Sequence, residues 1–455
     1  MSRVVPQKLT SYNALPVGVS NKQFEISYAS MIPANSSSNT EFTPKGTSRL
    51  LFRVPAYQNT FLDNSRSTIS FKFKADSDPS DAAANGYILD PSLGTTSIFK
   101  RMIIKSPNGL VIEHVDDLHV LNKILETMSS THQSRHLEGI LEGTTVQSTS
   151  LTTAEKQALK AKQKDGVRLQ YMFNHGMLSR KLQSFLPLHS MNGGNQGMAF
   201  TMELFLNDGY NVLQKIGTGG ASTTKSYGIS DVKYNMTLLK ADEAIISRFN
   251  NLANDSSEIV IPFSTYRSYT NSLASKKSSV QISEACSDLR SVHTVIRDGT
   301  ATTEPVDTGF SSELTFLGGF ENALQVEKYQ LQVGSKFIFN ESLESEADNS
   351  DMLNQVINAS YSKSDIKALR LSGNTGSMAY EDEDFTLTTS FCYSDPAQFT
   401  NGISLGSLPL VLRLDLVQTP DDKSLITFSE LGYNLVIKDG YISVRDSKSI
   451  EDFGY

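Results

Sequence analysis

Two stretches of this chain, roughly 230 residues apart, repeat the same succession of patterns. The first consists of a strand, a Ser-Pro-Asn-Gly turn, a second strand and a helix, at residues 98–105, 106–109, 110–113 and 115–128. The second consists of a strand, a Gly-Ser turn, a second strand and a helix, at residues 324–333, 334–335, 336–339 and 350–360. This spacing far exceeds a solenoid period, so the sequence predicts two copies of one large β domain. A duplicated β domain without recognisable catalytic motifs favours a structural protein over an enzyme.

The length and charge of the chain narrow the choice further. A chain of 455 residues is too long for one ordinary hydrophobic core and fits two domains of about 200 residues each. The formal net charge of −8 argues against a surface that wraps nucleic acid. The first 45 residues carry four basic and two acidic side chains, so a basic arm for packaging single-stranded genomes is not predicted.

Cysteine usage and the N-terminal sequence indicate a protein that stays inside the cell that makes it. Two cysteines, Cys286 and Cys392, cannot form a disulfide framework, which is typical of a reducing compartment. The first residues contain no apolar core of a secretory signal, so secretion is not expected. No apolar run is long enough to predict a membrane-spanning helix.

Strand patterns fill both halves of the chain. In the first half they lie at residues 48–54, 67–74, 98–105, 110–113, 167–173, 199–206 and 232–239. In the second half they lie at residues 258–263, 278–282, 292–297, 324–333, 336–339, 385–391, 408–417, 431–437 and 441–444. Ile69, Phe71 and Phe73 alternate with polar residues, the period of a half-buried strand. A capping box from Thr152 to Glu155 predicts a further short helix in the first half.

These patterns predict an all-β protein made of two tandem eight-stranded sandwiches, with short inserted helices and long loops. We divide the chain into an N-terminal arm, a first sandwich, a linker helix, a second sandwich and a C-terminal tail, at residues 1–45, 46–241, 242–257, 258–446 and 447–455. The arm is polar and rich in proline, so we expect it to order only against neighbouring molecules. We expect the two sandwiches to bury their hydrophobic faces separately and to pack side by side.

No pattern in the sequence predicts a catalytic, cofactor-binding or metal-binding residue. His132 and His136 stand four residues apart but lack the glutamate of a zinc protease motif, so a solvated helix end is favoured. Cys286 and His293 could pair as nucleophile and base, but a cysteine among apolar neighbours is usually a small core residue. We therefore predict that the protein is not an enzyme and carries no cofactor.

Two loops superficially resemble ligand sites. Residues 217–228 are rich in glycine and threonine, yet Lys225 follows Thr224 and lacks the preceding glycine of a phosphate-binding loop. A long exposed loop is therefore expected there. The acidic segments at residues 76–81 and 341–348 lack the spacing of a calcium-binding loop, so solvated loops are expected.

Glycan binding or processing stays open as an alternative, because β-sandwiches often serve that purpose. The chain has no tryptophan to form a sugar platform, although 17 tyrosines and 23 phenylalanines could substitute. Most of the phenylalanines fall in strand-like alternation and are expected in the core. Hydrolysis would require two carboxylates at a defined separation, which a sequence does not reveal.

Four segments, taken in order, resemble the double jelly-roll major capsid proteins of tailless icosahedral double-stranded DNA viruses. The segments are residues 61–73, residues 103–113 with the helix that follows, residues 327–335 with the helix near 350, and residues 402–416. The likeness spans residues 45–445 and is strongest to the polinton-like viruses and virophages. Each motif alone is weak, and only their order and duplication make the resemblance specific.

The resemblance implies a function in the virion and a set of partners. Three copies would form a homotrimer whose six jelly rolls have a pseudo-hexagonal outline, and such trimers would tile an icosahedral shell. Penton and minor capsid proteins would be partners, the arm and the tail would contact neighbours, and sequence-specific binding to nucleic acid is not expected. Loops at residues 76–90, 139–149, 190–196, 217–228 and 341–349 would lie at the ends of the rolls. A single-roll capsid protein of an RNA or single-stranded DNA virus is the viral alternative.

Overall fold

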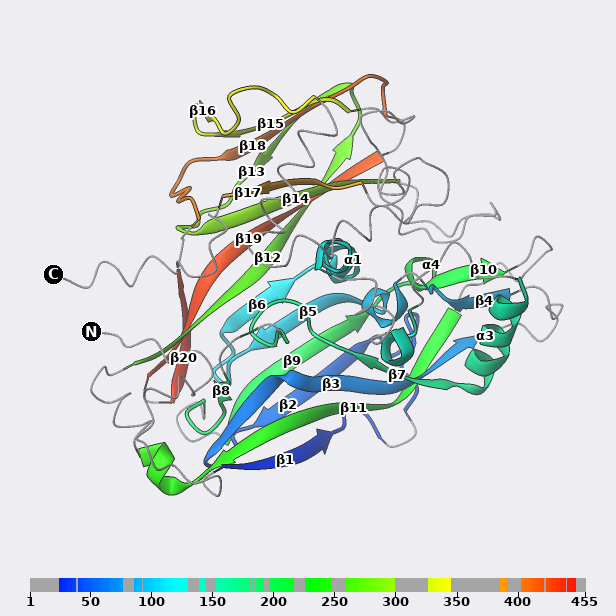
Figure 1. Ribbon diagram of the computed structural model, residues 1–455, viewed down its shortest axis with the longest axis vertical. Coiled ribbons are helices and arrows are strands. Elements are labelled where there is room, and N and C mark those ends of the chain that lie inside the picture. The colour runs from blue at the N-terminus through cyan, green and yellow to red at the C-terminus, as the bar shows by residue number, and fades with distance from the viewer. Residues whose placement is uncertain are drawn as a thin grey trace.

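The computed structural model consists mainly of antiparallel strands arranged in two sandwich-shaped units (Figure 1). The unit drawn in blue to green contains the first half of the chain, and the unit drawn in green to red contains the second half. The structure describes residues 24–37, 40–76, 86–91, 93–129, 139–144, 153–180, 182, 185–191, 197–216, 226–247, 258–298, 326–344, 385–391, 402–420, 423–438 and 440–446.

The first unit is a sandwich of two antiparallel sheets. One sheet has the order β1 (Phe24–Met31), β11 (Ser226–Ala241), β3 (Thr60–Asp76) and β7 (Val167–Tyr171). The facing sheet has the order β2 (Arg49–Pro55), β9 (Met198–Leu206), β5 (Phe99–Lys105) and β6 (Val111–Val115). When these strands are counted from one to eight along the chain, the two sheets have the orders 1-8-3-6 and 2-7-4-5.

The second unit repeats this connectivity. One sheet has the order β12 (Ile259–Leu273), β19 (Lys423–Lys438), β14 (Leu289–Asp298) and β17 (Leu387–Ser390). The facing sheet has the order β13 (Lys277–Ile282), β18 (Leu410–Leu416), β15 (Val326–Val333) and β16 (Lys336–Phe337). The orders are again 1-8-3-6 and 2-7-4-5, which is the connectivity of a jelly roll. The predicted fold class, two tandem eight-stranded jelly rolls, is confirmed.

The strands form where apolar side chains recur at every second position. In β18 the four leucines are buried, and Arg413 between them is exposed. In β3 the predicted alternation is confirmed, because Ile69, Phe71 and Phe73 have no exposed surface. Burial of each such side chain contributes about 1.5–3 kcal/mol to folding, so a one-residue slip of either strand would be strongly unfavourable.

The N-terminal arm expected at residues 1–45 is too long, because the chain joins the first roll from Phe24 onward. β1 pairs with β11 from Phe24 to Met31 and supplies the first of the eight strands. Phe42 is buried and forms a β-bridge with Ile229, so it too belongs to the first roll. The sequence reading missed this because β1 is an edge strand with polar and apolar residues on both faces. The remainder of the predicted arm, residues 1–23, lies outside the described residues.

Short helices fill the connection between the fifth and sixth strands of the first roll. α1 (Leu118–Ser129) confirms the predicted helix, although Val115 ends β6 instead of starting the helix. α3 (Thr153–Asp165) follows the predicted capping box and is longer than expected. Of the predicted linker helix only residues 243–247 are described as helical, and Ile245 and Ile246 are buried there. The helix predicted at residues 350–360 lies outside the described residues.

Three of the expected loops contain regular structure. In the loop expected at residues 139–149, residues 139–142 are helical. The last residues of the loop expected at residues 217–228 belong to a strand instead, because β11 begins at Ser226 and Tyr227 is buried. The Tyr227 hydroxyl donates a 2.7 Å hydrogen bond to the Asn207 carbonyl. The loop expected at residues 76–90 contains β4 (Gly86–Leu89), which is buried and pairs with β10 (Leu213–Ile216). β8 (Leu186–Pro187) and β20 (Tyr441–Asp446) extend the sheets beside β3 and β19.

The hydrophobic core runs through both rolls. No sheet among the described residues contains strands of both rolls, yet their buried apolar side chains form one continuous cluster. The expectation that each roll buries its hydrophobic face separately is therefore wrong at the boundary between the rolls. The physical reason is that α1 closes the side of the first roll with apolar residues, and the second roll packs onto them. Among the described residues, no helix is long and apolar enough to cross a membrane.

Candidate functional site

The cysteine and histidine considered in the sequence as a catalytic pair are packed into the second roll. Cys286 is buried, and burial together with the charges of Glu284 and Asp446 raises the pKa of its thiol to about 11. Burial lowers the pKa of His293 to about 3. The His293 ring lies 3.0 Å from Ser291 Oγ and 3.1 Å from Thr388 Oγ1, so both ring nitrogens face hydroxyl groups. A protonated thiol and a neutral, enclosed imidazole are structural groups in the pH range of cells.

The other candidates from the sequence give no site within the described part of the chain. No cluster of three or more His, Cys, Asp or Glu side chains there could hold a metal ion. His132, His136 and the glycine-rich residues 217–225 lie outside the described residues. Of the acidic segment at residues 341–348, residues 341–344 are described, and Glu344 among them forms a 3.0 Å ion pair with Lys328.

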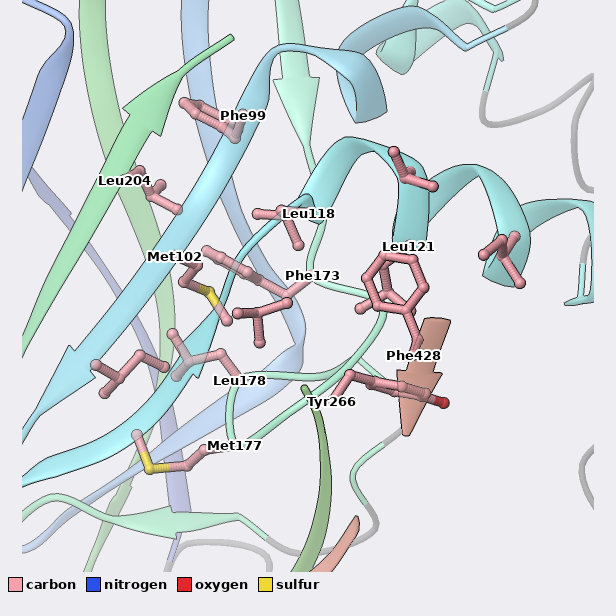
Figure 2. Close-up of a cluster of buried hydrophobic side chains, with 14 of the residues drawn as sticks. Phe99, Met102, Leu118, Leu121, Phe173, Met177, Leu178, Leu204, Tyr266 and Phe428 are labelled. Atoms are coloured by element: carbon pink, nitrogen blue, oxygen red, sulfur yellow. The ribbon is translucent and has the colours of Figure 1, made fainter. Parts of the chain in front are cut away.

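Within the described part of the chain, buried polar and apolar contacts meet at the boundary between the two rolls, which we call the seam. Its apolar part centres on Leu118 and Leu121 of α1 (Figure 2). The ring of Phe428 points from β19 of the second roll toward α1, and Tyr266 of β12 lies beside it. All four side chains are buried and belong to the continuous core. The seam therefore joins the rolls as a core does, and not as a contact between two separate surfaces.

A buried carboxylate crosses the seam. Glu113 of β6 is 2% exposed, in a strand position that faces inward. Its Oε1 accepts a 2.9 Å hydrogen bond from the Thr265 hydroxyl of β12, in the other roll. Its Oε2 accepts a 3.1 Å hydrogen bond from the Met177 amide, and His175 Nδ1 lies 3.5 Å from Oε1. Since an unpaired buried carboxylate is strongly unfavourable, this network favours one relative position of the two rolls.

The backbone beside Glu113 is shaped around its carboxylate. Gly176 has φ +75°, a conformation that side chains rarely adopt. A Cβ at this position would overlap the Glu113 carboxylate. The chain can therefore pass close enough for the amide of Met177 to donate to Glu113 only because residue 176 is glycine.

Further polar contacts extend the seam along β12 and β14. Arg297 of β14 donates a 3.1 Å hydrogen bond to Oδ1 of Asn211 in α4 (Gly209–Val212), which belongs to the first roll. The Thr270 hydroxyl lies 3.4 Å from Asp117 Oδ2. Burial raises the pKa of Asp117, although the positive charge of Arg297 opposes that shift. Burial and the same arginine lower the pKa of His119 well below its usual value.

The sequence alone does not predict the seam residues. Residues 103–113 belong to the repeated succession of elements, but Thr265, the donor to Glu113, lies 152 residues away in the chain. The one local signal was a charged residue at an inward-facing position of a strand. No local pattern identifies Thr265 as its donor.

Comparison with known proteins places this geometry in context. No protein-family model matches the sequence, and no curated protein is a detectable relative. A chain of the Sputnik virophage structure matches with a TM-score of 0.55 and 12% identity, covering 95% of this chain and 91% of that chain. A chain of the PBCV-1 virus capsid matches with a TM-score of 0.55 and 9% identity, covering 93% and 97%. The mavirus major capsid protein matches with a TM-score of 0.50 and 11% identity, covering 100% and 97%.

The fold is a double jelly roll. The matches cover nearly the whole of each chain, so the likeness extends over both rolls. At these identities the likeness concerns the fold alone. Within this double jelly roll, the seam is the part of the structure that fixes one roll against the other. The alternative of a single-roll capsid protein is wrong, because the chain contains two complete rolls.

Proposed function

We propose that this chain is a structural major capsid protein. Three copies form a pseudo-hexagonal homotrimer, and trimers tile the icosahedral shell of a double-stranded DNA virus of the polinton-like and virophage group. The protein is assembled inside the host cell and resides in the virion. It performs no catalysis and binds no cofactor.

The observation that carries this proposal is the identical strand order of the two rolls. Three copies of a chain with two equivalent rolls present six similar units around a threefold axis, so a trimer can occupy a position with six neighbours. The seam supports the same function, because a tile must hold its two rolls in one fixed arrangement. The buried Glu113–Thr265 hydrogen bond and the shared apolar core provide that rigidity.

Solved structures with the same fold support the proposal. One belongs to the Sputnik virophage, one to the PBCV-1 virus capsid, and one is the mavirus major capsid protein. We infer that the partners of this chain are its own copies, neighbouring trimers, a penton protein and minor capsid proteins. The net charge of −8 supports a shell component that makes no sequence-specific contact with nucleic acid.

The mass of the purified protein in solution tests the proposal. Light scattering coupled to size-exclusion chromatography should give about 150 kDa, three times the 50.0 kDa chain. Electron microscopy of the protein should then show three-fold particles with a six-sided outline. A stable monomer at high protein concentration would contradict the proposal.

A further inference from the structure

The second roll carries an open groove on the side that faces away from the first roll. The groove lies on the solvent face of the β13-β18-β15-β16 sheet, which is the sheet of the second roll farther from the seam (Figure 1). Its volume is about 780 Å³, within the range of about 300–1,000 Å³ that is usual for small-ligand sites. The residues that line it, all of them described, include none of the seam residues, so the groove is independent of the contacts that join the two rolls.

The floor of the groove consists of paired charges on three neighbouring strands. The strand register places Asp415 of β18 between Lys277 of β13 and Lys328 of β15. Asp415 lies 3.6 Å from Lys277, and Lys328 forms its 3.0 Å ion pair with Glu344. Opposite charges therefore alternate across the floor and stabilise the sheet, without an excess of either sign.

The wall of the groove is formed by residues 338–344, which are fixed to β15 at two points. At the first point, Nε2 of Gln330 donates a 3.0 Å hydrogen bond to the Phe339 carbonyl, and its Oε1 accepts a 3.3 Å hydrogen bond from the Phe339 amide. At the second point, Tyr329 and Leu343 exchange two backbone hydrogen bonds of 2.9 Å. A wall that is already fixed in the free protein loses little conformational entropy when a ligand binds.

Three polar side chains on this wall have no internal partner. Asn340, Glu341 and Ser342 line the groove, and within the described part of the chain their side chains make no hydrogen bond or ion pair. An amide, a carboxylate and a hydroxyl group are therefore available there, and together they can both donate and accept hydrogen bonds.

An aromatic ring and a guanidinium group complete the groove. Phe337 of β16 is 53% exposed, and the Arg413 guanidinium lies 5.2 Å from the centre of its ring. Arg413 forms no ion pair with any described residue, so its planar set of N–H donors is available beside the ring. An apolar surface thus lies next to a forked hydrogen-bond donor.

We propose that this groove binds a short, neutral oligosaccharide. A sugar ring has a face of C–H groups, which can stack on Phe337, and a rim of hydroxyl groups, which can bond to Arg413 and to the polar side chains of the wall. The inference goes beyond the proposed function, because it gives a shell protein a binding activity toward glycans.

Charge and shape favour a neutral sugar over other ligands. Three basic and three acidic side chains line the groove, so their formal charges cancel; they are Lys277, Lys328 and Arg413, and Glu341, Glu344 and Asp415. A groove without net positive charge is a poor site for nucleic acid. β16 contains two residues, which is too short an edge strand to pair with an added peptide strand.

An array of immobilised oligosaccharides, probed with the purified full-length protein, tests the proposal. The protein should bind neutral oligosaccharides, and this binding should change little between about 50 and 500 mM NaCl, because it does not depend on net charge. Binding of sulfated or other acidic glycans alone, lost at the higher salt concentration, would overturn the proposal, since exposed lysines produce that pattern without a built site. Binding of no glycan would overturn it as well.

Substitutions in the groove show whether the sugar binds there. Phe337→Ala should weaken binding of the best neutral oligosaccharide about tenfold in isothermal titration calorimetry. Arg413→Lys keeps the charge but loses the forked donor, so it should weaken binding too. Tyr441→Ala is the matched control, since Tyr441 is 55% exposed and does not line the groove, and it should bind as the wild type does. Equal affinities of the wild type and Phe337→Ala would overturn the inference.

Saturation-transfer NMR on the wild-type protein tests the same contact without a substitution. Irradiation of the aromatic protons should transfer saturation to the C–H protons on one face of the bound sugar ring, because that face stacks on Phe337. Transfer to no C–H proton of a sugar that binds would place the sugar away from an aromatic ring and would overturn the proposal. All variants should keep the circular dichroism of the wild type, because the substituted side chains are exposed.

Discussion

Thr265, in the first strand of the second roll, donates a 2.9 Å hydrogen bond to Glu113, in the fifth strand of the first roll. Both residues are buried, and the two strands belong to different sheets of different rolls. The Glu113 carboxylate keeps this hydrogen bond only in one relative position of the two rolls. A displacement that broke it would leave a buried acceptor without its donor, which is unfavourable by about 1–3 kcal/mol.

Replacing Thr265 by valine tests the contribution of this hydrogen bond. Thr265→Val keeps the size and β-branching of the side chain but removes the donor to Glu113, so we expect a loss of about 1–3 kcal/mol in the free energy of unfolding. Urea unfolding followed by fluorescence or circular dichroism measures it. Thr270→Val is the control, because Thr270 is exposed and its contact with Asp117 is 3.4 Å, and it should change stability by about 0.5 kcal/mol or less. Equal effects of the two substitutions would contradict the importance of the Glu113 network.

Gly176→Ala tests the close approach of the backbone to Glu113. An alanine at this position would have to adopt the left-handed backbone conformation, which costs about 1 kcal/mol. Its Cβ would also overlap the Glu113 carboxylate. We expect a total loss of roughly 3 kcal/mol. Gly109→Ala is the matched control, since Gly109 has φ +87° but nothing within 4 Å of its Cβ position, and it should lose only the backbone part. Shortening Glu113 to alanine in the Gly176→Ala protein should cost less than in the wild type, and strict additivity would argue against the overlap.

The pH dependence of stability should report on the burial of His293. Its folded pKa, about 3, lies below the ordinary value of 6.5, so the unfolded chain binds the proton first as the pH falls. Between pH 6.5 and 3 this histidine therefore lowers stability by about 1.4 kcal/mol for each pH unit of acidification. His119 and His189 act in the same direction, because burial lowers their pKa values too. The raised pKa of Asp117 acts in the opposite direction above pH 3.8.

His293→Gln isolates this contribution, because an amide can still face the hydroxyl groups of Ser291 and Thr388. The free energy of unfolding, measured by urea denaturation from pH 6 down to pH 4, should fall less steeply in this variant than in the wild type, by about 1.4 kcal/mol per pH unit. His114→Gln is the control, since the His114 side chain is 46% exposed. The same slope in wild type and His293→Gln would show that His293 does not resist protonation in the folded state.

A double-mutant cycle across the seam tests whether the two rolls share one core. Leu121→Ala and Phe428→Ala each remove a buried apolar side chain, which costs about 2–5 kcal/mol. Because the two side chains lie together at the seam, their combined effect should differ from the sum by about 0.5 kcal/mol or more. Leu121→Ala combined with Leu412→Ala is the control pair, and its effects should add. Leu412 is buried in β18, which belongs to the other sheet of the second roll from the one that contains Phe428. Additivity in both pairs would mean that the rolls have separate cores.

The sequence predicted those elements whose signal is local. Leucines at every second position predicted β18, and Ile69, Phe71 and Phe73 predicted the centre of β3. The repeated succession of strand, turn and strand predicted two equivalent units, and the shared 1-8-3-6 and 2-7-4-5 orders confirm it. The sequence does not predict β1, because its apolar and polar side chains do not alternate strictly between the two faces of the strand. Its assignment depends on pairing with β11, about 200 residues away in the chain, which local patterns do not encode.

The sequence by itself determined that the chain is made of strands, that it holds two similar units, and that Ile69, Phe71 and Phe73 belong to a core. These properties follow from the period of side-chain burial, which depends only on neighbouring residues. Tertiary structure alone decided that the rolls share a core through α1, that Glu113 meets Thr265, and that Ile26 and Tyr28 of β1 stay exposed. Those facts arise from packing between residues remote in sequence, where the shape of one roll selects what the other buries.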